Sequence, residues 1–405
     1  MPSESSLYLT AEEAAEMMGV AVPSLYAYVG RKGIRSQPIP GQRARLYWRE
    51  DVEKIANRKS KASVVNWDSV LVPQTKITLI TEEGPYYRGH SAVGLADTAT
   101  LEDVAALLWE QDKVAVFPDT APSSPHTVRR ARAALAHMSA SEKIGSLLAL
   151  LEHSNPRNYD RTAPGFFRAS GDLLRWFAAL AIGAEEPSTK PVHFVLARGW
   201  KAPRGFEDMI RRMLVLLADH ELTADTYAVR AVANAGCTPH QAVMAGIVAT
   251  GGYRLGQGRG PALRRLIEEI VTNEDSGQPL IERYREGEPI PGFEGGPIGS
   301  VAAGGGRDAR AVSLLKTLEE QFGGDRDVRR LLKAVEVARE GIGVEPNIRV
   351  VYFFMERKLK IPPDDASLKV VARIVGWLAH AFEQMESGPL VRPRTAYAGP
   401  LPFHP

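Results

Sequence analysis

The chain has 405 residues, of which 44% are hydrophobic and 24% charged, and its formal net charge is only +2. This composition is typical of a folded globular protein, and the length suffices for two or three domains. The single cysteine, Cys237, excludes an internal disulfide framework and a multi-cysteine metal site, and it favours a reducing compartment. No apolar run reaches the roughly 18 residues of a membrane helix, and no basic residue precedes an apolar stretch at the N-terminus. We therefore expect a cytoplasmic protein without a membrane partner.

The positive charge is concentrated near one end of the chain. Residues 23–61 carry ten Lys or Arg residues against three acidic residues, a net charge of +7. A basic segment attached to a nearly neutral body is typical of a nucleic-acid-binding module. A solubilising basic arm would have the same charge, so the residue pattern within the segment has to decide between the two.

The first predicted elements are two short helices joined by a turn. Thr10 followed by Glu13 fits a capping box, which predicts that a helix begins at this point. Gly19 would end that helix, because glycine adopts the left-handed conformation at little cost. Pro23 would begin the second helix, since proline is favoured in the first helical turn. The spacing predicts a helix-turn-helix, whose second helix can enter the major groove of DNA.

The expected DNA contacts come from the second helix and from a hairpin after it. Leu25 would face the core, which leaves the polar side chains of that helix outward. A hairpin tip is predicted at residues 38–41, and basic residues then alternate with apolar ones on a returning strand, which would form a wing along phosphate. A closing helix is predicted at residues 50–58. The candidate DNA-binding residues are Ser24, Tyr26, Arg31, Lys32, Arg43 and Arg45.

This segment resembles the winged helix-turn-helix of excisionase and MerR-type proteins. The resemblance rests on LTAEEAAEMMGVAVPSLYAYVGRKGI and on RLYWREDVEKI after it. It implies a DNA-binding domain over residues 1–61, followed by a linker over residues 62–70, where periodic signals are few. The alternative is a degenerate winged helix that contacts protein instead of DNA.

Helical patterns dominate the rest of the chain. Apolar residues recur at spacings of three and four in ten segments, whereas the clearest strand signal is KITLIT at residues 76–81. Glycine-rich loops are expected at residues 251–260 and 292–306. These patterns predict a mostly helical globule. The predicted helices cover residues 101–110, 127–137, 141–153, 170–182, 205–219, 242–250, 261–271, 307–322, 326–339 and 368–385.

Six motifs follow one another in this helical part: ITEEGPYYRGHSAVGLADTATLEDVAALLWE, LLADHELTADTYAVRAVANAGCTPHQAVMAGIVATGGYRLGQG, PIPGFEGG, RDARAVSLL, VEPNIRVVYFF and ARIVGWLAHAFEQ. In sequence and in order they resemble the citrate synthase family. The resemblance implies an all-α fold with a large and a small helical domain over residues 71–405, the small one at roughly residues 225–340. It also implies a homodimer whose active site lies between the domains and is completed by the partner chain.

The family condenses an acyl-CoA thioester with oxaloacetate, and the resemblance implies which residues bind these molecules. His220 in ADHE, Arg373 in ARIVGW and Arg392 in RPR match family residues that contact the oxo-acid, Arg392 by reaching into the neighbouring subunit. The alternatives are a histidine that only satisfies backbone groups and arginines in structural ion pairs at the dimer interface. Arg307 and Arg310 in GGGRDAR match the region near the CoA nucleotide, where they would bind phosphate or begin a helix as exposed arginines.

The family's catalytic residues are replaced at the matching positions. Leu255 and Gly295 stand where the family has histidines, and Arg349 stands where it has an aspartate base. A general base contributes ~10²–10⁴-fold to the rate and an oxyanion donor ~10²–10³-fold, so losing all three should remove most activity. Arg349 stays protonated and cannot act as the base near neutral pH. Glu294 and Glu356 are the candidates for a substitute.

These observations favour a catalytically impaired member of the family that binds oxaloacetate, citrate or an acyl-CoA and couples ligand occupancy to DNA contact. The alternative is an active acyltransferase with a CoA thioester as substrate, alone or as a hetero-oligomer with an intact paralogue. A scaffold without ligand is the third interpretation. No tightly bound cofactor and no metal are expected, because the histidines lack metal-ligand spacing. His380 is expected to be packed and structural.

Overall fold

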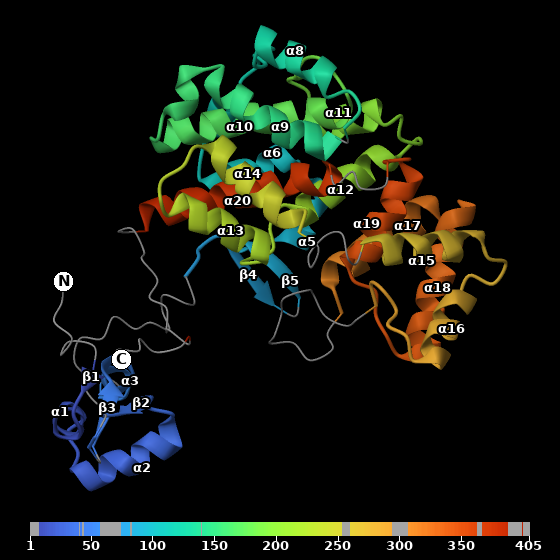
Figure 1. Ribbon diagram of the computed structural model, residues 1–405. Coiled ribbons are helices and arrows are strands. Elements are labelled where there is room, and N and C mark those ends of the chain that lie inside the picture. Colours follow the sequence, from blue (N-terminus) through green and yellow to red (C-terminus); the bar gives the residue numbers. More distant parts are fainter. Residues whose placement is uncertain are drawn as a thin grey trace. The chain divides into compact units, whose positions relative to one another are not determined.

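The computed structural model of the chain describes residues 8–39, 41–42, 44–56, 74–81, 83–138, 140–252, 260–293, 307–362, 367–387 and 399. The chain divides into two compact units, Met1–Gln74 and Thr75–Pro405, and each is described by itself (Figure 1). The expected linker at residues 62–70 lies outside the described residues. Within the described ranges, no helix is long and apolar enough to cross a membrane.

The first unit begins with the expected pair of short helices. The capping box is confirmed, because the Thr10 hydroxyl accepts from the Glu13 N–H at 3.2 Å while the Glu13 carboxylate accepts from the Thr10 N–H at 2.8 Å. Gly19 follows the first helix with a φ of +61°, the left-handed conformation that glycine favours. Pro23 lies in the first turn of the second helix, as predicted. The helices are α1 (Ala11–Met17), α2 (Val22–Lys32) and α3 (Arg49–Ala56).

Three short strands form an antiparallel sheet in the order β1-β3-β2. Leu25 of α2 is fully buried in the small core of this unit, together with Val52 of α3. The Arg35 guanidinium donates two hydrogen bonds of 2.9 Å to the Asp51 carboxylate, which ties the sheet to α3. The strands are β1 (Tyr8–Leu9), β2 (Ser36–Pro38) and β3 (Arg45–Trp48).

A second small sheet opens the second unit. The strand predicted at residues 76–81 is confirmed as β4 (Thr78–Thr81), which pairs with β5 (Gly84–Tyr87), and β6 (His90–Ser91) completes the sheet. The buried Tyr87 hydroxyl lies 3.0 Å from the Val215 carbonyl and 3.1 Å from the Asp219 carbonyl. This contact fixes the sheet to the end of the helix Phe206–Leu217.

The rest of the second unit is helical and falls into two groups. The first group contains α5 (Ala92–Thr98), α6 (Leu101–Trp109), α7 (Lys113–Val116), α8 (His126–Ala134), α9 (Ala140–His153), the 3₁₀ helix η2 (Pro156–Tyr159), α10 (Ala163–Ala181), α11 (Val192–Gly199), α12 (Phe206–Leu217), α13 (Ala224–Ala233), α14 (Pro239–Thr250) and α20 (Ser367–Glu386). The long α20 is its central helix and contacts α6, α10, α12, α13 and α14 (Figure 1). The prediction of a mostly helical fold is therefore confirmed.

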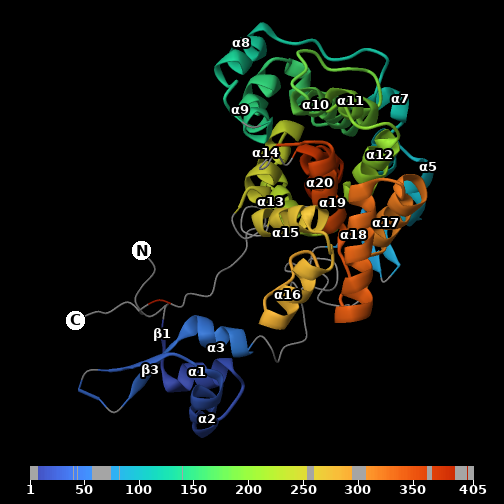
Figure 2. The ribbon, with the colours of Figure 1, turned by 90° about the vertical axis from the view of Figure 1, so that its right-hand side faces the viewer.

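The second group contains α15 (Gly260–Thr272), α16 (Gln278–Glu286), α17 (Ala309–Phe322), α18 (Arg326–Val337), the π-helical turn η4 (Ala338–Ile342) and α19 (Ile348–Lys358). These helices contact one another and lie together in two perpendicular views (Figures 1 and 2). α13 and α14 pack on α20 instead. The second group thus spans residues 260–358, whereas the sequence led us to expect a small subdomain at residues 225–340.

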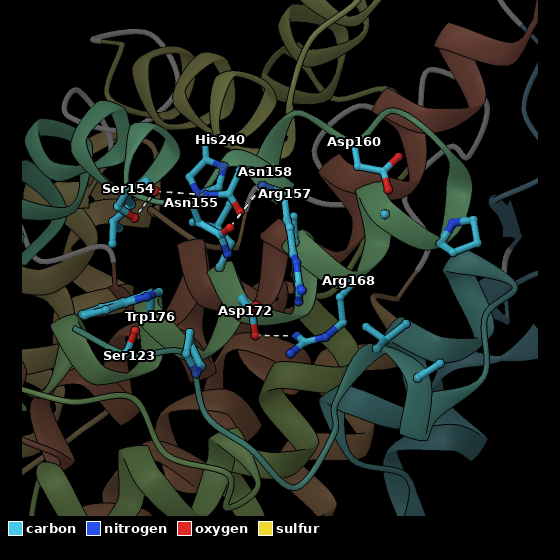
Figure 3. A pocket seen from close by; sticks show the side chains of 18 of the residues that line it. Ser123, Ser154, Asn155, Arg157, Asn158, Asp160, Arg168, Asp172, Trp176 and His240 are labelled. Carbon is cyan, nitrogen blue, oxygen red and sulfur yellow. Dashed lines mark hydrogen bonds and ion pairs between the residues drawn. The ribbon is translucent and has the colours of Figure 1, made fainter. Parts of the chain in front are cut away.

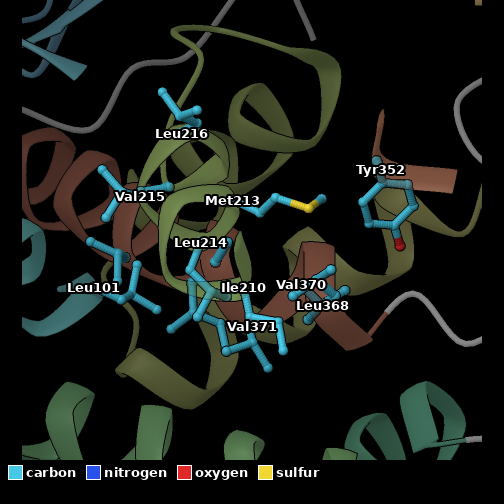
Figure 4. Packing of buried hydrophobic residues seen from close by; sticks show 14 of the residues in the cluster. Leu101, Ile210, Met213, Leu214, Val215, Leu216, Tyr352, Leu368, Val370 and Val371 are labelled. Carbon is cyan, nitrogen blue, oxygen red and sulfur yellow. The ribbon is translucent and has the colours of Figure 1, made fainter. Parts of the chain in front are cut away.

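Buried apolar side chains from both helix groups join into one continuous core. Leu101 of α6, Leu214 of α12 and Val371 of α20 interlock in the first group, and all three are fully buried (Figure 4). Figure 4 also shows Met213 of α12 extending toward Tyr352 of α19. Burying such side chains contributes about 1.5–3 kcal/mol each relative to exposure, so the core holds the two groups together.

Each of the ten predicted helical segments contains a helix, but several helices were not predicted. α10 begins at Ala163, seven residues before the predicted start, since the Thr162 hydroxyl caps it and Pro164 occupies its first turn. The helices outside the predicted ranges are α5, α7, α11, α13, α16 and α19.

Candidate functional site

Arg373 of α20 is the centre of a buried polar cluster. Its guanidinium donates to the hydroxyls of Thr226 at 2.7 Å and Thr223 at 2.9 Å, at the beginning of α13. It also lies 3.4 Å from the Asp219 carboxylate and 3.5 Å from the Asp225 carboxylate. Only 4% of Arg373 is exposed. The cluster therefore holds a fixed cation where α12, α13 and α20 meet.

A chain of polar contacts runs from Asp219 along α20. The Asp219 carboxylate lies 3.2 Å from Nε2 of His380, whose Nδ1 lies 3.2 Å from Arg230. Arg230 pairs with Glu383 at 2.6 Å, and Glu383 accepts a hydrogen bond from the main-chain N–H of Lys76 at 2.8 Å. His380 is fully buried, as expected of a structural histidine. Burial would raise the pKa of Asp219, but His380 and the nearby arginine reverse this and hold that pKa well below its usual range.

His220 follows Asp219 and lies beside two arginines. Burial, then the charges of Arg310 and Arg373, lower the pKa of the His220 imidazole to about 3, so the ring is neutral at pH 7. Its Nδ1 atom is buried and has no hydrogen-bond partner among the described residues. A buried polar atom without a partner costs about 1–3 kcal/mol. Buried polar groups in folded proteins normally have a partner, so this atom calls for one from outside the described residues, such as a water molecule or a ligand.

Arg310 is held by a buried carboxylate at the beginning of α17. Its guanidinium donates to Asp308 at 3.0 and 2.9 Å, and Asp308 also accepts from the Ile348 N–H at 3.0 Å. Arg310 thereby lowers the pKa of Asp308 against the effect of burial. Asp308 joins the beginnings of α17 and α19 and positions Arg310 beside His220. Asp308 is not among the residues predicted from the sequence, although it stands in the same RDAR motif.

The two arginines expected near CoA have different environments. Arg310 is 5% exposed, so the alternative of an exposed arginine at a helix start is wrong for this residue. That alternative fits Arg307, whose side chain is 67% exposed and pairs with Glu345 at 2.7 Å. The burial of Arg310 follows from its partner Asp308, which removes the cost of an unpaired charge.

Arg349 lies in the first turn of α19. It stands at the position where, by the family resemblance, other members have an aspartate base. Asn347 caps this helix and accepts from the Arg349 N–H at 3.0 Å. Glu356, one of the two candidate substitutes, lies two turns further along α19 and pairs with Arg264 at 3.2 Å. This pairing holds the Glu356 carboxylate away from the first turn of the helix.

Four of the residues predicted for the catalytic and oxo-acid sites lie outside the described part of the chain. They include both positions where the family has histidines and the second candidate substitute for the base. Their expected roles stay predictions from the sequence. These residues are Leu255, Gly295, Glu294 and Arg392.

The first unit exposes part of the predicted DNA-binding set. Ser24 and Tyr26 lie on the exposed side of α2, and Tyr26 is 57% exposed. Arg45 is exposed on β3, where its guanidinium donates to the Ser36 hydroxyl at 3.0 Å and to the Ser36 carbonyl at 3.1 Å. Three further members lie where no side chain is described, namely Arg31 and Lys32 at the end of α2 and Arg43 between the strands.

A cavity of about 650 Å³ lies elsewhere in the second unit, between η2, α10 and α14 (Figure 3). His240 lines it, and burial lowers the pKa of this imidazole to about 4. Arg168 pairs with Asp172 on the opposite wall, and Trp176 closes one side (Figure 3). None of the candidate ligand-binding residues predicted from the sequence lines this cavity.

The described residues offer no metal or thiol chemistry to the site. No group of three or more His, Cys, Asp or Glu side chains in these ranges could hold a metal ion. Cys237 is buried, and burial raises the pKa of its thiol to about 11, so it stays protonated near neutral pH. The chemistry of the described site therefore rests on its arginines and on His220.

Comparison with known proteins identifies the family. The family model for the citrate synthase C-terminal domain matches residues 66–394. Citrate synthase of Mycolicibacterium smegmatis is 27% identical, covering 82% of this chain and 93% of its own, while that of Synechocystis is 31% identical over 46% of this chain and 47% of its own. A citrate synthase of Thermoplasma acidophilum has been solved in ternary complex with carboxymethyl coenzyme A and oxaloacetate. It shares the fold with a TM-score of 0.66 at 17% identity, and the match covers 82% of this chain and 95% of that one. Since the family model matches well over half of its length, the chain belongs to the citrate synthase family.

Proposed function

We propose that this chain is a catalytically impaired citrate synthase-family protein that binds a dicarboxylate or tricarboxylate, such as oxaloacetate or citrate. The observation that carries the proposal is the meeting of Arg310 and Arg373 at His220, whose buried Nδ1 has no partner among the described residues. Guanidinium groups bind carboxylates through paired, charge-assisted hydrogen bonds. In this proposal, His220 and the two arginines bind the carboxylates, and Arg392 of the partner subunit adds a contact.

The impairment is inferred from the residues at the catalytic positions. Arg349 has no lone pair for an α-proton near neutral pH, because a guanidinium stays charged there. Leu255 and Gly295 supply no imidazole to polarise a carbonyl group. Glu356 is paired with Arg264 and does not replace the base.

The exposed Arg307 is the candidate contact for the phosphate groups of an acyl-CoA. Its guanidinium is 67% exposed at the entry to α17, where a large anionic ligand can reach it. A CoA thioester would then be a ligand of the protein, and it would be a substrate if turnover remains.

The first unit is proposed to be a winged helix-turn-helix that binds DNA. The exposed Ser24 and Tyr26 on α2 and the exposed Arg45 on β3 support this interpretation. Closure of the two helix groups over a ligand would be the two-state motion that couples metabolite binding to DNA contact.

A thiol-release assay with acetyl-CoA or propionyl-CoA and oxaloacetate tests the impairment, and calorimetric titration with oxaloacetate and citrate tests binding. We expect binding without thiol release. Turnover by the purified chain alone would overturn the proposal in favour of an active synthase. An active synthase is the second candidate because the relatives of this chain are citrate synthases. Turnover only after mixing with an intact paralogue would favour a subunit of a mixed oligomer. Flat titrations would favour a scaffold.

A further inference from the structure

The cavity between η2, α10 and α14 has no part in the function proposed above, yet it has the dimensions of a ligand site. Its volume of about 650 Å³ lies within the roughly 300–1,000 Å³ of small-molecule sites. Its lining combines apolar side chains with a few polar groups, as such sites usually do. His220, Arg310 and Arg373 do not line it, so a ligand in this cavity would be separate from one at the polar cluster around Arg373.

His240, at the beginning of α14, lines the cavity with an imidazole that lacks a partner. Only 4% of the residue is exposed, its Nδ1 atom is buried, and the ring makes no hydrogen bond to any described residue. Burial lowers the pKa of the ring to about 4, so it is neutral at pH 7 and has one donor and one acceptor nitrogen. A hydroxyl group on a ligand can donate or accept, and it would therefore serve either nitrogen.

Arg157 of η2 is a cation without a partner among the described residues. Its main chain is held in place, because the Asn155 side chain accepts from the Arg157 N–H at 3.1 Å. The side-chain amide of Asn158 also donates to two main-chain carbonyl groups at the end of α9, at 3.0 and 3.1 Å. Figure 3 shows the Arg157 side chain extending from η2 toward Arg168. The cavity thus has a positioned guanidinium group on its wall.

The two carboxylates of the lining already have partners. Asp172 pairs with Arg168, and Asp160 accepts from the N–H and the hydroxyl of Thr162 at 2.9 and 2.8 Å. Arg157 is therefore the lining arginine that remains for a ligand, and one carboxylate would pair with it.

Trp176 of α10 gives the cavity an aromatic wall. It lies one helical turn after Asp172 and closes one side of the space (Figure 3). Indole rings pack well against other aromatic rings. The body of the ligand should therefore be a ring, with its charge at Arg157 and its polar group at His240.

We infer that this cavity binds a hydroxylated aromatic monocarboxylate. The carboxylate pairs with Arg157, the ring packs against Trp176 and the hydroxyl group forms a hydrogen bond with the His240 imidazole. The site is independent of the proposed function, because it shares no residue with the polar cluster around Arg373.

Isothermal titration calorimetry of the full-length chain with 4-hydroxyphenylacetate tests the inference. We expect saturable binding that excess oxaloacetate does not displace. The amide 4-hydroxyphenylacetamide lacks the charge and should bind ~10- to 100-fold more weakly, whereas phenylacetate lacks the hydroxyl group and should bind ~2- to 10-fold more weakly. Absence of binding, displacement by oxaloacetate or equal affinities for the three compounds would overturn the site and leave the proposed function standing.

Two variants assign the contacts. Arg157→Gln should weaken binding of the acid ~10- to 100-fold and leave binding of the amide unchanged. Arg161→Gln is the matched control, since it removes the same charge from an exposed residue shortly after η2 that does not line the cavity. His240→Leu should make the affinities for 4-hydroxyphenylacetate and phenylacetate equal. Equal losses in the two arginine variants, or a preference for the hydroxyl group that survives in a folded His240→Leu protein, would contradict the inference.

Discussion

Gly376 of α20 lies directly against Asp219, the carboxylate that pairs with Arg373 and His380. A Cβ atom at residue 376 would overlap the Asp219 Oδ1 and would lie 2.5 Å from the Ala218 carbonyl oxygen. The Gly376 N–H donates to that same carbonyl at 3.1 Å. The absence of a side chain at Gly376 is therefore what lets α20 approach the end of α12 and places Arg373 in the buried polar cluster.

Gly376→Ala should destabilise the second unit and weaken carboxylate binding together. Overpacking of this kind typically costs about 1–3 kcal/mol, because backbone atoms of Ala218 cannot move aside as a flexible side chain can. Thermal unfolding measures the loss. Gly145→Ala in α9 is the matched control, since no described atom lies within 4 Å of the place that its Cβ would take, and it should stabilise the helix by about 0.5–1 kcal/mol. An unchanged melting temperature for Gly376→Ala would contradict this account.

Arg373→Lys should weaken the binding of oxaloacetate and citrate ~10- to 100-fold, equivalent to the about 1.5–3 kcal/mol of a charged hydrogen bond. Lysine keeps the charge but loses the fork that contacts Thr223 and Thr226. Isothermal titration calorimetry at constant salt measures the change. Arg307→Lys is the control and should leave dicarboxylate affinity unaltered, because that side chain is exposed and pairs with Glu345. Equal losses in the two variants would mean that general charge, not the pocket, governs binding.

The stability of the protein should fall as the pH is lowered from about 6.5 toward 3. The pKa of His220 is lowered to about 3 and that of His240 to about 4, whereas an unfolded histidine has a pKa of about 6.5. Below pH 6.5 the unfolded chain thus binds more protons than the folded one, so stability is fully present above that pH and is lost below it. Chemical denaturation at pH 7, 6 and 5 measures the slope.

Single and double substitutions show which histidine causes the dependence of stability on pH. His220→Gln and His240→Gln should each make the dependence on pH shallower, and the double variant should combine both effects because the residues lie in separate places. A slope that neither substitution changes would show that other groups dominate the acid sensitivity.

The first unit should bind duplex DNA with a salt dependence that Arg45 partly supplies. Arg45→Ala should reduce the slope of log affinity against log salt by about 1, the effect of losing one phosphate contact. Fluorescence anisotropy measures this slope at several salt concentrations, with labelled duplex DNA from the region upstream of the gene that encodes this chain. Arg129→Ala in the second unit serves as the control. If both variants behave like the wild type, Arg45 does not contact phosphate.

Tyr227 of α13 and Val248 of α14 are exposed apolar residues, at 59% and 71%, on two helices that pack together. An exposed apolar face on a folded protein indicates a contact surface, and we expect Tyr227 and Val248 to lie in the interface of the homodimer that the family resemblance implies. Tyr227→Glu should shift the chain toward monomers in sedimentation velocity experiments. Tyr284→Glu, at an equally exposed tyrosine of α16, should not. Dimers that tolerate Tyr227→Glu would place the interface elsewhere.

Local signals were sufficient for much of the fold. The Thr10–Glu13 capping box and Pro23 are short-range patterns, and the helices that they predict are present. Apolar spacing alone did not predict α19, because buried apolar residues lie on nearly all of its sides and obscure a three-and-four spacing; VEPNIRVVYFF, one of the motifs of the family resemblance, contains its start. α10 begins earlier than predicted since its first turns are set by Thr162 and Pro164 and not by apolar periodicity.

The site was predictable only in part, and for a physical reason. His220 and Arg373 stand in motifs that the family resemblance carries, and the structure brings both together with Arg310. The interactions of Asp308 depend on how the beginnings of α17 and α19 meet, which no local pattern encodes. The burial of Arg310 in particular depends on a carboxylate two residues away and on the beginning of a different helix.

The two carboxylate oxygens of Glu383 make different contacts. One pairs with Arg230, and the other accepts a hydrogen bond from the main-chain N–H of Lys76. Lys76 is the second residue of the unit Thr75–Pro405. The Glu383 carboxylate therefore holds the beginning of this unit at Lys76 and also takes part in the chain of polar contacts that begins at Arg373. Polar contacts thus connect Arg373, through Asp219, His380 and Arg230, to Glu383 and the main chain at Lys76.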